Sequence, residues 1–188
     1  MKRFIIHFDD QCYLLDCKKM NIRTAAIEDL KAMVEIYNQA IAAGRMTADI
    51  TPFTTAGRKK WFLDHTPDKY PIWVGEDNHV IVGYLTISPY RPGRLALRHT
   101  AEVSCFIHFE HHRQGIASDL LRHAIGACPA LQIKNLFAII IDSNQASINL
   151  MVKYGFEKWG YLPRVAEFDG IEYGHLYYGL RIEKCRQN

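Results

Sequence analysis

The chain has 188 residues, of which 48% are hydrophobic and 23% are charged, and its formal net charge is +3 at pH 7. This is the composition of an ordinary globular protein, and a chain of this length can bury an ample core as one domain. The small positive excess, without a run of about five like charges, argues against a nucleic-acid-binding arm or a membrane-surface patch. No apolar stretch reaches the roughly 18 residues that a membrane span needs.

The five cysteines are odd in number and include no Cys-x-x-Cys pair, so a disulfide framework is not expected and a cytoplasmic location fits best. Residues 1–19 have a basic start and a short apolar patch that Asp9 and Asp10 interrupt, which does not fit a signal peptide. We expect this N-terminal extension to be an extra strand, a loose tail or the product of an upstream start codon. Residues 20–188 are expected to form a single domain.

The first half of this domain contains alternating strand and helix patterns. The expected elements are a strand at 20–24, a helix at 27–44, a shorter helix at 55–65, and strands at 72–75 and 80–88 joined by the turn 76–79. The first helix is indicated by apolar residues at helical spacing, namely Ile27, Leu30, Val34, Tyr37 and Ile41. Gly44 is expected to end it.

The second half begins with a proline-containing loop at 89–98 and continues with a strand at 100–109. Alternation in this strand assigns Val103, Cys105, Ile107 and Phe109 to one face and Glu102, Ser104, Phe106 and His108 to the other. The further elements are a helix with Ile116, Leu120, Leu121 and Ile125 on its apolar stripe, a buried strand at 136–141, a helix at 147–154, and strands at 157–162 and 172–182. This order predicts a mixed α/β sheet with helices on both faces.

The most informative segment runs from His112 to Ala117, where a strand is followed by the start of a helix. The first turn of a helix has unpaired backbone N–H groups and a partial positive charge, which together suit a pyrophosphate. Gly115 would let such a ligand approach the backbone, and Arg113 adds a cation. On spacing alone, a turn that simply needed a glycine explains the segment equally well.

The same segment resembles the Gln/Arg-x-x-Gly-x-Gly/Ala motif of the GCN5-related N-acetyltransferases, the GNAT family. Further motifs follow in the family's order: Asn144-x-x-Ser147 and then Tyr154-Gly155-Phe156. The stretch from Arg98 to Glu102, with Tyr90-Arg91-Pro92 before it and Gly160-Tyr161-Leu162 after it, is similar to the phosphinothricin and methionine-sulfone acetyltransferase branch. The resemblance covers residues 20 to about 182.

This resemblance implies a single-domain GNAT-like fold, with a mixed, mostly antiparallel central sheet flanked by helices on both faces. It implies acetyl-CoA as co-substrate, no metal, and direct acetyl transfer to a primary amine of a small, amino-acid-like molecule. The implied acetyl-CoA-binding residues are Cys105, Phe106, Ile107, His112, Arg113, Gln114, Gly115, Ile116, Ala117, Ser118, Asn144 and Ser147. Backbone N–H groups of the strand segment 105–107 would also bind the thioester carbonyl.

Glu102 is the expected catalytic residue, because a glutamate at this position acts as the general base in the resembling branch. A thioester needs a neutral amine, and a carboxylate can accept the proton as the amine attacks. Without the family context, Glu102 would be interpreted as a solvated strand carboxylate. Cys105 is expected to be a buried structural cysteine, not a nucleophile, because it shares a face with core residues.

Two positions depart from the family pattern. His112 stands where Gln or Arg is usual, and an imidazole is a poorer ligand for a pyrophosphate than a guanidinium. Met151 stands where many members have a Tyr or His that protonates the leaving thiolate. Tyr154 lies on another side of that helix, so the general acid stays unassigned.

The substrate-binding residues are less clear from the sequence. Tyr90, Arg91, Arg98 and Tyr173 are candidates because their loops should flank the cleft, and an arginine could hold a substrate carboxylate. Each is equally well explained as a solvated loop residue. Relatives often have a basic-aromatic-polar-Asp run after the final glycine, whereas residues 171–174 here are Ile-Glu-Tyr-Gly, which argues against importing the relatives' substrate.

Three other interpretations stay open. His108, His111 and His112 beside Glu110 could hold a metal, although only three imidazoles are local. A non-catalytic CoA-binding module would keep the phosphate loop without needing a base. A protein N-acetyltransferase would have an open groove in place of a closed pocket. The oligomeric state is equally open, and a homodimer is common among similar proteins.

Overall fold

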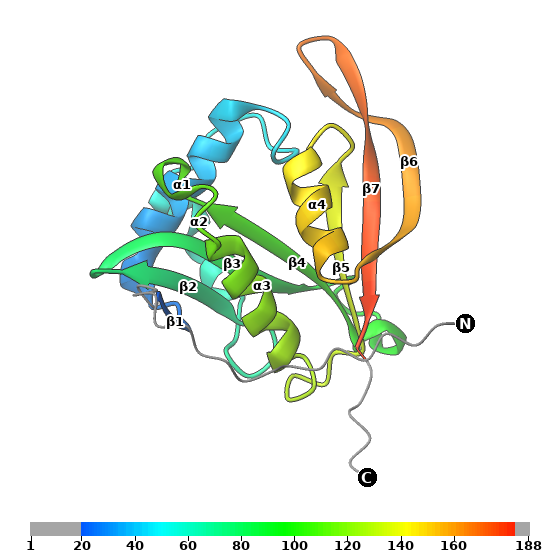
Figure 1. Ribbon diagram of the computed structural model, residues 1–188. Coiled ribbons are helices and arrows are strands. Elements are labelled where there is room, and N and C mark those ends of the chain that lie inside the picture. The colour runs from blue at the N-terminus through cyan, green and yellow to red at the C-terminus, as the bar shows by residue number, and fades with distance from the viewer. Residues whose placement is uncertain (1–19, 183–188) are drawn as a thin grey trace, which may run out of the picture.

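The computed structural model describes residues 20–182 (Figure 1); the predicted extension at 1–19 lies outside them. The strands are β1 (Asn21–Thr24), β2 (Ile72–Asp77), β3 (Val80–Pro89), β4 (Thr100–Ile107), β5 (Asn135–Ile141), β6 (Glu157–Phe168) and β7 (Ile171–Arg181). The helices are α1 (Leu30–Ala43), α2 (Thr55–Leu63), α3 (Ile116–Ala127) and α4 (Gln145–Lys153), and there are 3₁₀ turns at Ile27–Asp29, Leu95–Leu97 and Phe109–His111. This is the predicted order of strands and helices.

All seven strands form one sheet in the order β1-β2-β3-β4-β5-β7-β6. Five of the six neighbouring pairs are antiparallel, and only β4 and β5 run parallel. The mixed, mostly antiparallel sheet that the family resemblance implies is therefore confirmed.

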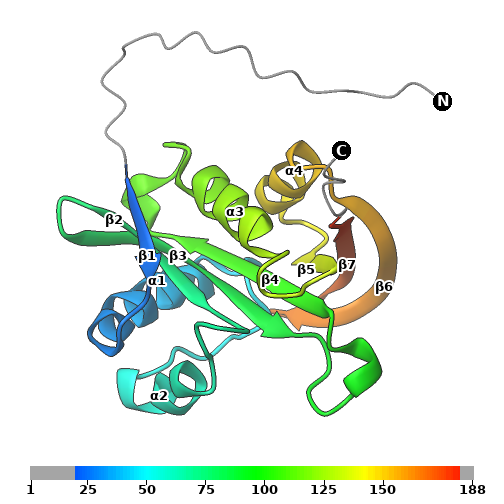
Figure 2. The same cartoon turned by 90° about the horizontal axis from the view of Figure 1, so that it is seen from below.

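The helices cover both faces of the sheet, with α1 and α2 on one side and α3 and α4 on the other (Figure 2). Each layer has its own core. Leu120 and Leu121 of α3 pack with Leu85 and Leu136 of the sheet, and all four side chains are fully buried. Burying the apolar stripe of each helix in this way is the main stabilising contribution, because the apolar side chains leave water.

The parallel pair β4 and β5 is in register over only three residues, from Thr100 to Glu102 on β4. Beyond Glu102 the two strands diverge, as Figure 1 shows. Backbone groups on the β5 side of β4 therefore have no strand partner after this point. A wedge-shaped opening in the middle of a sheet leaves hydrogen-bonding groups available to a ligand.

The structure corrects several predicted boundaries. The strand predicted at 100–109 ends at Ile107, and Phe109 begins a 3₁₀ turn instead. Strand β2 extends through Asp77, so that only Asn78 and His79 form the hairpin turn, both with positive φ (49° and 64°). A two-residue turn with positive φ at both positions matches the twist of the flanking strands, which explains the shorter turn.

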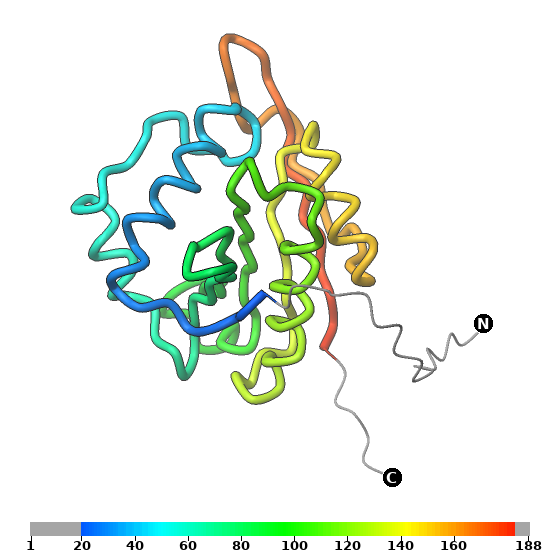
Figure 3. Tube along the Cα trace, turned by 60° about the vertical axis from the view of Figure 1, so that its left-hand side comes forward, coloured from blue at the N-terminus to red at the C-terminus, as the bar shows by residue number. Residues whose placement is uncertain are grey.

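The hairpin of β6 and β7 is much longer than predicted, because β6 reaches Phe168 and not residue 162. Two register irregularities in β6, after Lys158 and after Leu162, break the alternation that sequence patterning relies on. Figure 3 shows the end of this hairpin projecting beyond the rest of the sheet.

Candidate active site

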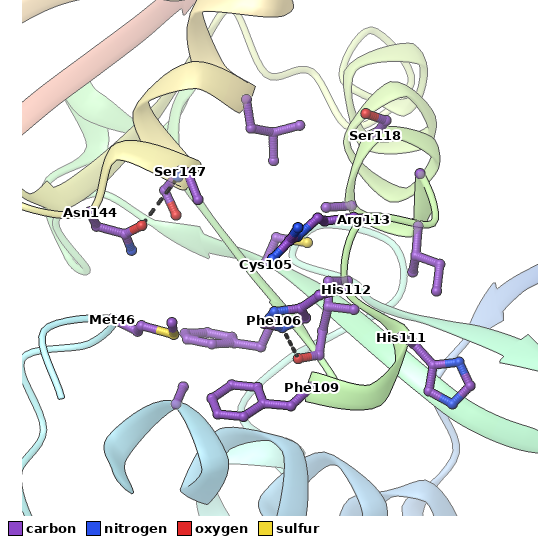
Figure 4. A pocket seen from close by; sticks show the side chains of 17 residues that line it. Met46, Cys105, Phe106, Phe109, His111, His112, Arg113, Ser118, Asn144 and Ser147 are labelled. Atoms are coloured by element: carbon purple, nitrogen blue, oxygen red, sulfur yellow. Dashed lines mark hydrogen bonds between the residues drawn. The ribbon is translucent and has the colours of Figure 1, made fainter. Parts of the chain in front are cut away.

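A cavity of about 480 Å³, called the larger cavity below, lies at the opening beside β4. Segments from four elements converge on it, namely β4, the start of α3, the start of α4 and the loop after α1 (Figure 4). Its lining residues are Ala40, Met46, Cys105, Phe106, Ile107, Phe109, His111, His112, Arg113, Gly115, Ile116, Ala117, Ser118, Asn144, Ala146, Ser147 and Leu150. All the predicted acetyl-CoA-binding residues except Gln114 are in this set.

The N-terminus of α3 contributes backbone donors to this cavity. The first helical hydrogen bond runs from Asp119 N–H to the Gly115 carbonyl, so the N–H groups of residues 116–118 precede the helical ladder. Gly115 has φ of 86°, a left-handed conformation that favours glycine, and a side chain added there would meet nothing within 4 Å. The helix start is therefore an open cradle that an anionic group fits.

The N-terminus of α4 opens onto the same cavity. Asn144 caps this helix, because its Oδ1 accepts a hydrogen bond of 3.2 Å from the Ser147 backbone N–H. The cap uses the oxygen of Asn144 and leaves its amide donors free to face a ligand. Two helix N-termini thus direct partial positive charge at one cavity.

The segment between β4 and α3 is held by local hydrogen bonds. The His112 ring donates from Nε2 to the Ile107 carbonyl at 3.0 Å, and Gln114 donates to the Glu110 carbonyl at 3.2 Å. Gln114 therefore fixes the loop and does not line the cavity. Arg113 adopts φ of 62° and is exposed at the cavity. It is the cation closest to the α3 N-terminus in sequence.

The second cavity, of about 350 Å³, contains Glu102 and shares Met46 and Phe106 with the first. Its lining residues are Tyr37, Met46, Thr47, Ala48, Asp49, Arg58, Trp61, Tyr84, Thr86, Ser88, Glu102, Ser104, Phe106, Ile139, Ile141 and His175. Alternation along β4 assigns Glu102, Ser104 and Phe106 to one face, as the sequence predicts.

Burial changes the pKa of two side chains on β4, the Glu102 carboxyl and the Cys105 thiol. Desolvation raises the pKa of Glu102 above that of an ordinary glutamate. Desolvation also raises the pKa of Cys105 to about 12, so this residue is a neutral thiol at physiological pH. Cys105 packs against the core while it lines the larger cavity. Its chemistry matches the predicted structural role, because only a thiolate is a good nucleophile.

The sequence model of the Acetyltransferase (GNAT) family matches residues 30–156. The chain belongs to this family. A match of this extent includes β4, both helix N-termini and Glu102, and therefore every lining residue of the two cavities except His175.

Individual relatives support the same assignment. YwnH of Bacillus subtilis (strain 168), provisionally named a phosphinothricin acetyltransferase, is 39% identical over 82% of this chain and 94% of its own. The L-methionine sulfoximine/L-methionine sulfone acetyltransferase of Pseudomonas aeruginosa PAO1 is 31% identical over 88% of this chain and 96% of its own. The phosphinothricin acetyltransferase of Sinorhizobium meliloti, solved in complex with acetyl-CoA, superposes with a TM-score of 0.81 at 28% identity, over 86% of this chain and 88% of its own.

GNAT acetyltransferases take the acetyl group from acetyl-CoA, and this chain is an acetyltransferase of that family.

The four predicted substrate residues lie outside both cavity linings. Arg91 stacks near the Tyr90 ring, whose other contact is Phe137, and Arg98 donates to the Leu95 carbonyl. Tyr173 accepts a hydrogen bond of 3.0 Å from Arg45.

Sequence reasoning missed the residues that α1, α2 and β7 bring to the second cavity. Arg58, Asp49 and His175 lie far from Glu102 in the chain and match no motif of the family pattern. The only local signal was the aromatic and basic content of residues 53–61, which is also that of a solvated amphipathic helix. The tertiary packing of α2, of the loop after α1 and of β7 brings the three residues to one cavity.

Three further findings bear on the alternatives. Within residues 20–182 no group of three or more His, Cys, Asp or Glu side chains could hold a metal ion. Met151 is buried in the core and the Tyr154 hydroxyl is hydrogen-bonded to Arg122 at 3.3 Å, so neither is a cavity residue. None of the helices in the described part of the chain is long and apolar enough to cross a membrane.

Proposed function

We propose that this acetyltransferase moves the acetyl group of acetyl-CoA directly to a primary amine of a small, amino-acid-like molecule, with Glu102 as the general base. One observation carries the proposal. The cavity that contains Glu102 meets the cavity under the two helix N-termini at Phe106 and Met46. An acyl group held in the larger cavity would therefore lie next to an amine held in the smaller one, which supplies the proximity that catalysis needs.

For the acetyl donor, we propose that the pyrophosphate contacts the N–H groups that open α3 and that the pantetheine arm runs along β4. Because His112 already donates from Nε2 to the Ile107 carbonyl, its neutral ring has no N–H left for a phosphate. Arg113 and the backbone N–H groups of residues 115–118 would then supply the binding. Asn144 and Ser147 at the start of α4 would contact the same donor.

Acetyl-CoA supplies an activated acyl carbonyl, and the protein's task is to position and deprotonate the amine. In the proposed reaction the Glu102 carboxylate accepts the amine proton while the amine forms its bond to the acyl carbon and the C–S bond breaks. Unpaired backbone N–H groups in residues 105–107 would stabilise charge on the carbonyl oxygen. No general acid is assigned, and a thiolate with a pKa of about 8.5 can leave without one.

The acceptor cavity favours a small molecule over a protein chain. Arg45, on the loop after α1, donates to Tyr173 on β7 at 3.0 Å and lies over its ring. The neighbouring loop residues Met46 and Asp49 line the cavity from one side and His175 of β7 from the other. The two segments that would flank an open peptide groove are thus connected to each other.

We further propose a cytoplasmic location, because Cys105 and Cys128 are both free thiols, as proteins of reducing compartments have. Assembly as a homodimer stays a prediction from the resemblance alone.

The test is a thiol-release assay with acetyl-CoA and a panel of amines: amino acids, methionine sulfone, methionine sulfoximine, phosphinothricin, polyamines and a peptide N-terminus. We expect turnover with at least one amino-acid-like acceptor, and Glu102→Gln should lower it by about 100-fold or more. The affinity for CoA should change by less than about 2-fold. Glu157→Gln, an exposed strand carboxylate on β6, is the matched control.

Other outcomes would select the alternatives. Turnover of the peptide alone would indicate a protein N-acetyltransferase. Binding of CoA without thiol release for any amine would indicate a non-catalytic module. Undiminished turnover in the Glu102→Gln variant would refute the assignment of the base.

A further inference from the structure

Arg58 of α2 lies in an aromatic cradle at the wall of the cavity that contains Glu102. Its guanidinium carbon is 4.6 Å from the ring centroid of Tyr37, 4.2 Å from that of Phe53 and 4.6 Å from that of Trp61. These rings come from α1, the loop before α2, and α2 itself. Cation–π contacts at these distances hold the guanidinium in place without using its N–H donors.

Arg58 forms no ion pair with a carboxylate in the described part of the chain. The arginines at 23 and 122 each form ion pairs with acidic side chains, whereas Arg58 forms none. Asp49 lines the same cavity and its carboxylate accepts the Tyr37 hydroxyl at 2.5 Å, but no ion pair joins Asp49 to Arg58. A half-buried cation with free donors at a cavity wall is suited to receive its counter-ion from a ligand.

Arg58 and Glu102 line the same cavity but come from different elements, α2 and β4, and no hydrogen bond or ion pair joins them. Burial raises the pKa of Glu102. Glu102 therefore stays available as a base while Arg58 stays available to an anion.

We propose that Arg58 binds the carboxylate of the acceptor, so that the preferred substrates are amino carboxylates whose amine faces Glu102. This inference rests on the proposed function and names the specificity-determining residue for it. The planar guanidinium would pair with the planar carboxylate through two parallel N–H···O bonds. The predicted candidates Arg91 and Arg98 lie outside this cavity lining and are not needed for the contact.

The test compares L-methionine sulfone with its carboxamide, which keeps the amine and the side chain but lacks the carboxylate. For the wild-type protein we expect kcat/KM to be about 10- to 100-fold higher for the acid, the range expected for charged hydrogen bonds. The carboxamide also has the more easily deprotonated amine, so any bias from amine ionisation opposes the expected result.

Arg58→Met should reduce this ratio to about one, chiefly by raising KM for the acid, while the Tm and the affinity for CoA stay close to wild type. Arg58→Lys should give an intermediate ratio, because lysine keeps the positive charge but lacks the planar guanidinium that can donate two parallel hydrogen bonds. The matched control is Lys60→Met on the same helix, where Lys60 is 85% exposed and paired with Asp64; its ratio should equal that of the wild type.

Two results would overturn the proposal. One is a ratio near one between the kcat/KM values of the wild-type protein for the acid and for the carboxamide. This result does not depend on whether any variant folds. The other is an equal loss of turnover for acid and carboxamide in the Arg58 variants, which would assign Arg58 a purely structural role. Both leave the acetyltransferase function intact, whereas wild-type protein that acetylates no amine at all would refute the proposed function and this inference with it.

Discussion

Glu102 on β4 and Phe137 on β5 are the last residues that pair in register before the two strands diverge. The carboxylate therefore lies at the closed end of the opening, where sheet hydrogen bonding still holds the backbone in place. The residues that follow on β4, from Val103 to Ile107, run along the open side. One strand thus carries the proposed base and the backbone groups proposed for the donor, and the sheet fixes their relative positions.

The raised pKa of Glu102 predicts the pH dependence of the reaction. A general base is active only when ionised, and burial raises its pKa above the ordinary value. The acid limb of the kcat/KM profile should therefore fall at a higher pH than an ordinary glutamate would give. A profile measured with Glu102→Gln should lack this limb; the same limb in the variant would assign it to another group.

The same burial predicts that Glu102 costs stability at neutral pH. A carboxyl group whose folded pKa is raised binds more protons in the folded than in the unfolded state between the two pKa values. Its contribution is fully present below the unfolded pKa and is lost as pH rises through the folded pKa. Glu102→Gln should thus raise the Tm at pH 7 relative to wild type, with a smaller gain at pH 4. An equal Tm difference at both pH values would contradict this linkage.

Cys105 should be dispensable for chemistry. Its thiol has a pKa of about 12 and stays neutral, so it cannot act as the acyl acceptor. Cys105→Ala should keep kcat within about 3-fold and weaken donor binding slightly through lost apolar contact in the larger cavity. Intact-mass spectrometry of the protein mixed with acetyl-CoA should show no acetyl adduct on Cys105; a competent adduct would indicate a two-step mechanism.

Gly115→Ala should weaken CoA binding and destabilise the fold together. The left-handed φ of 86° costs a residue with a Cβ about 1–2 kcal/mol. The new methyl group would also project into the open space in front of the α3 N-terminus. Calorimetry of CoA binding and thermal unfolding measure the two effects. Gly126→Ala, on the same helix with open space and no positive φ, should bind CoA normally and be no less stable.

The Arg23 cluster should be a stability determinant independent of activity. Arg23 donates to both oxygens of Asp29 at 2.7 and 2.9 Å and to Glu76 at 2.8 Å. Desolvation alone would raise the pKa of Asp29, but the hydrogen bonds from Arg23 and from the Ala26 N–H lower it overall. This contribution is present above the unfolded pKa and is lost as pH falls through the folded pKa.

Arg23→Met should therefore lower the free energy of unfolding by about 1–3 kcal/mol at pH 7, less than for a fully buried pair because Arg23 is 36% exposed. Urea denaturation measures this loss, which should shrink in acid. The exposed pair at Lys60 is the comparison, and Lys60→Met should change stability by less than about 0.5 kcal/mol. A similar loss in both variants would contradict the role assigned to burial.

Patterns within the chain predicted the order of helices and strands and pointed to the residues proposed to bind acetyl-CoA. Apolar periodicity predicted α1 and α3, and the segment from His112 to Ala117 predicted an anion-binding helix start, because these features depend on residues close together in the chain. Alternation along one strand was also enough to separate Glu102 from Cys105. The predicted helices and the alternation along β4 are confirmed, because local backbone geometry fixes them, while the binding role of the α3 start stays a prediction.

The residues proposed to bind the amine acceptor become visible only in the folded structure. Which cations line the Glu102 cavity depends on how α2 packs against α1, and this packing brings Arg58 to the cavity while Arg91 and Tyr173 contact other groups. The opening itself arises because β4 and β5 pair over three residues and then diverge, which no pattern within either strand encodes. Contacts between elements distant in the chain are set by the combined packing of the whole core, so they become visible only once that core is assembled.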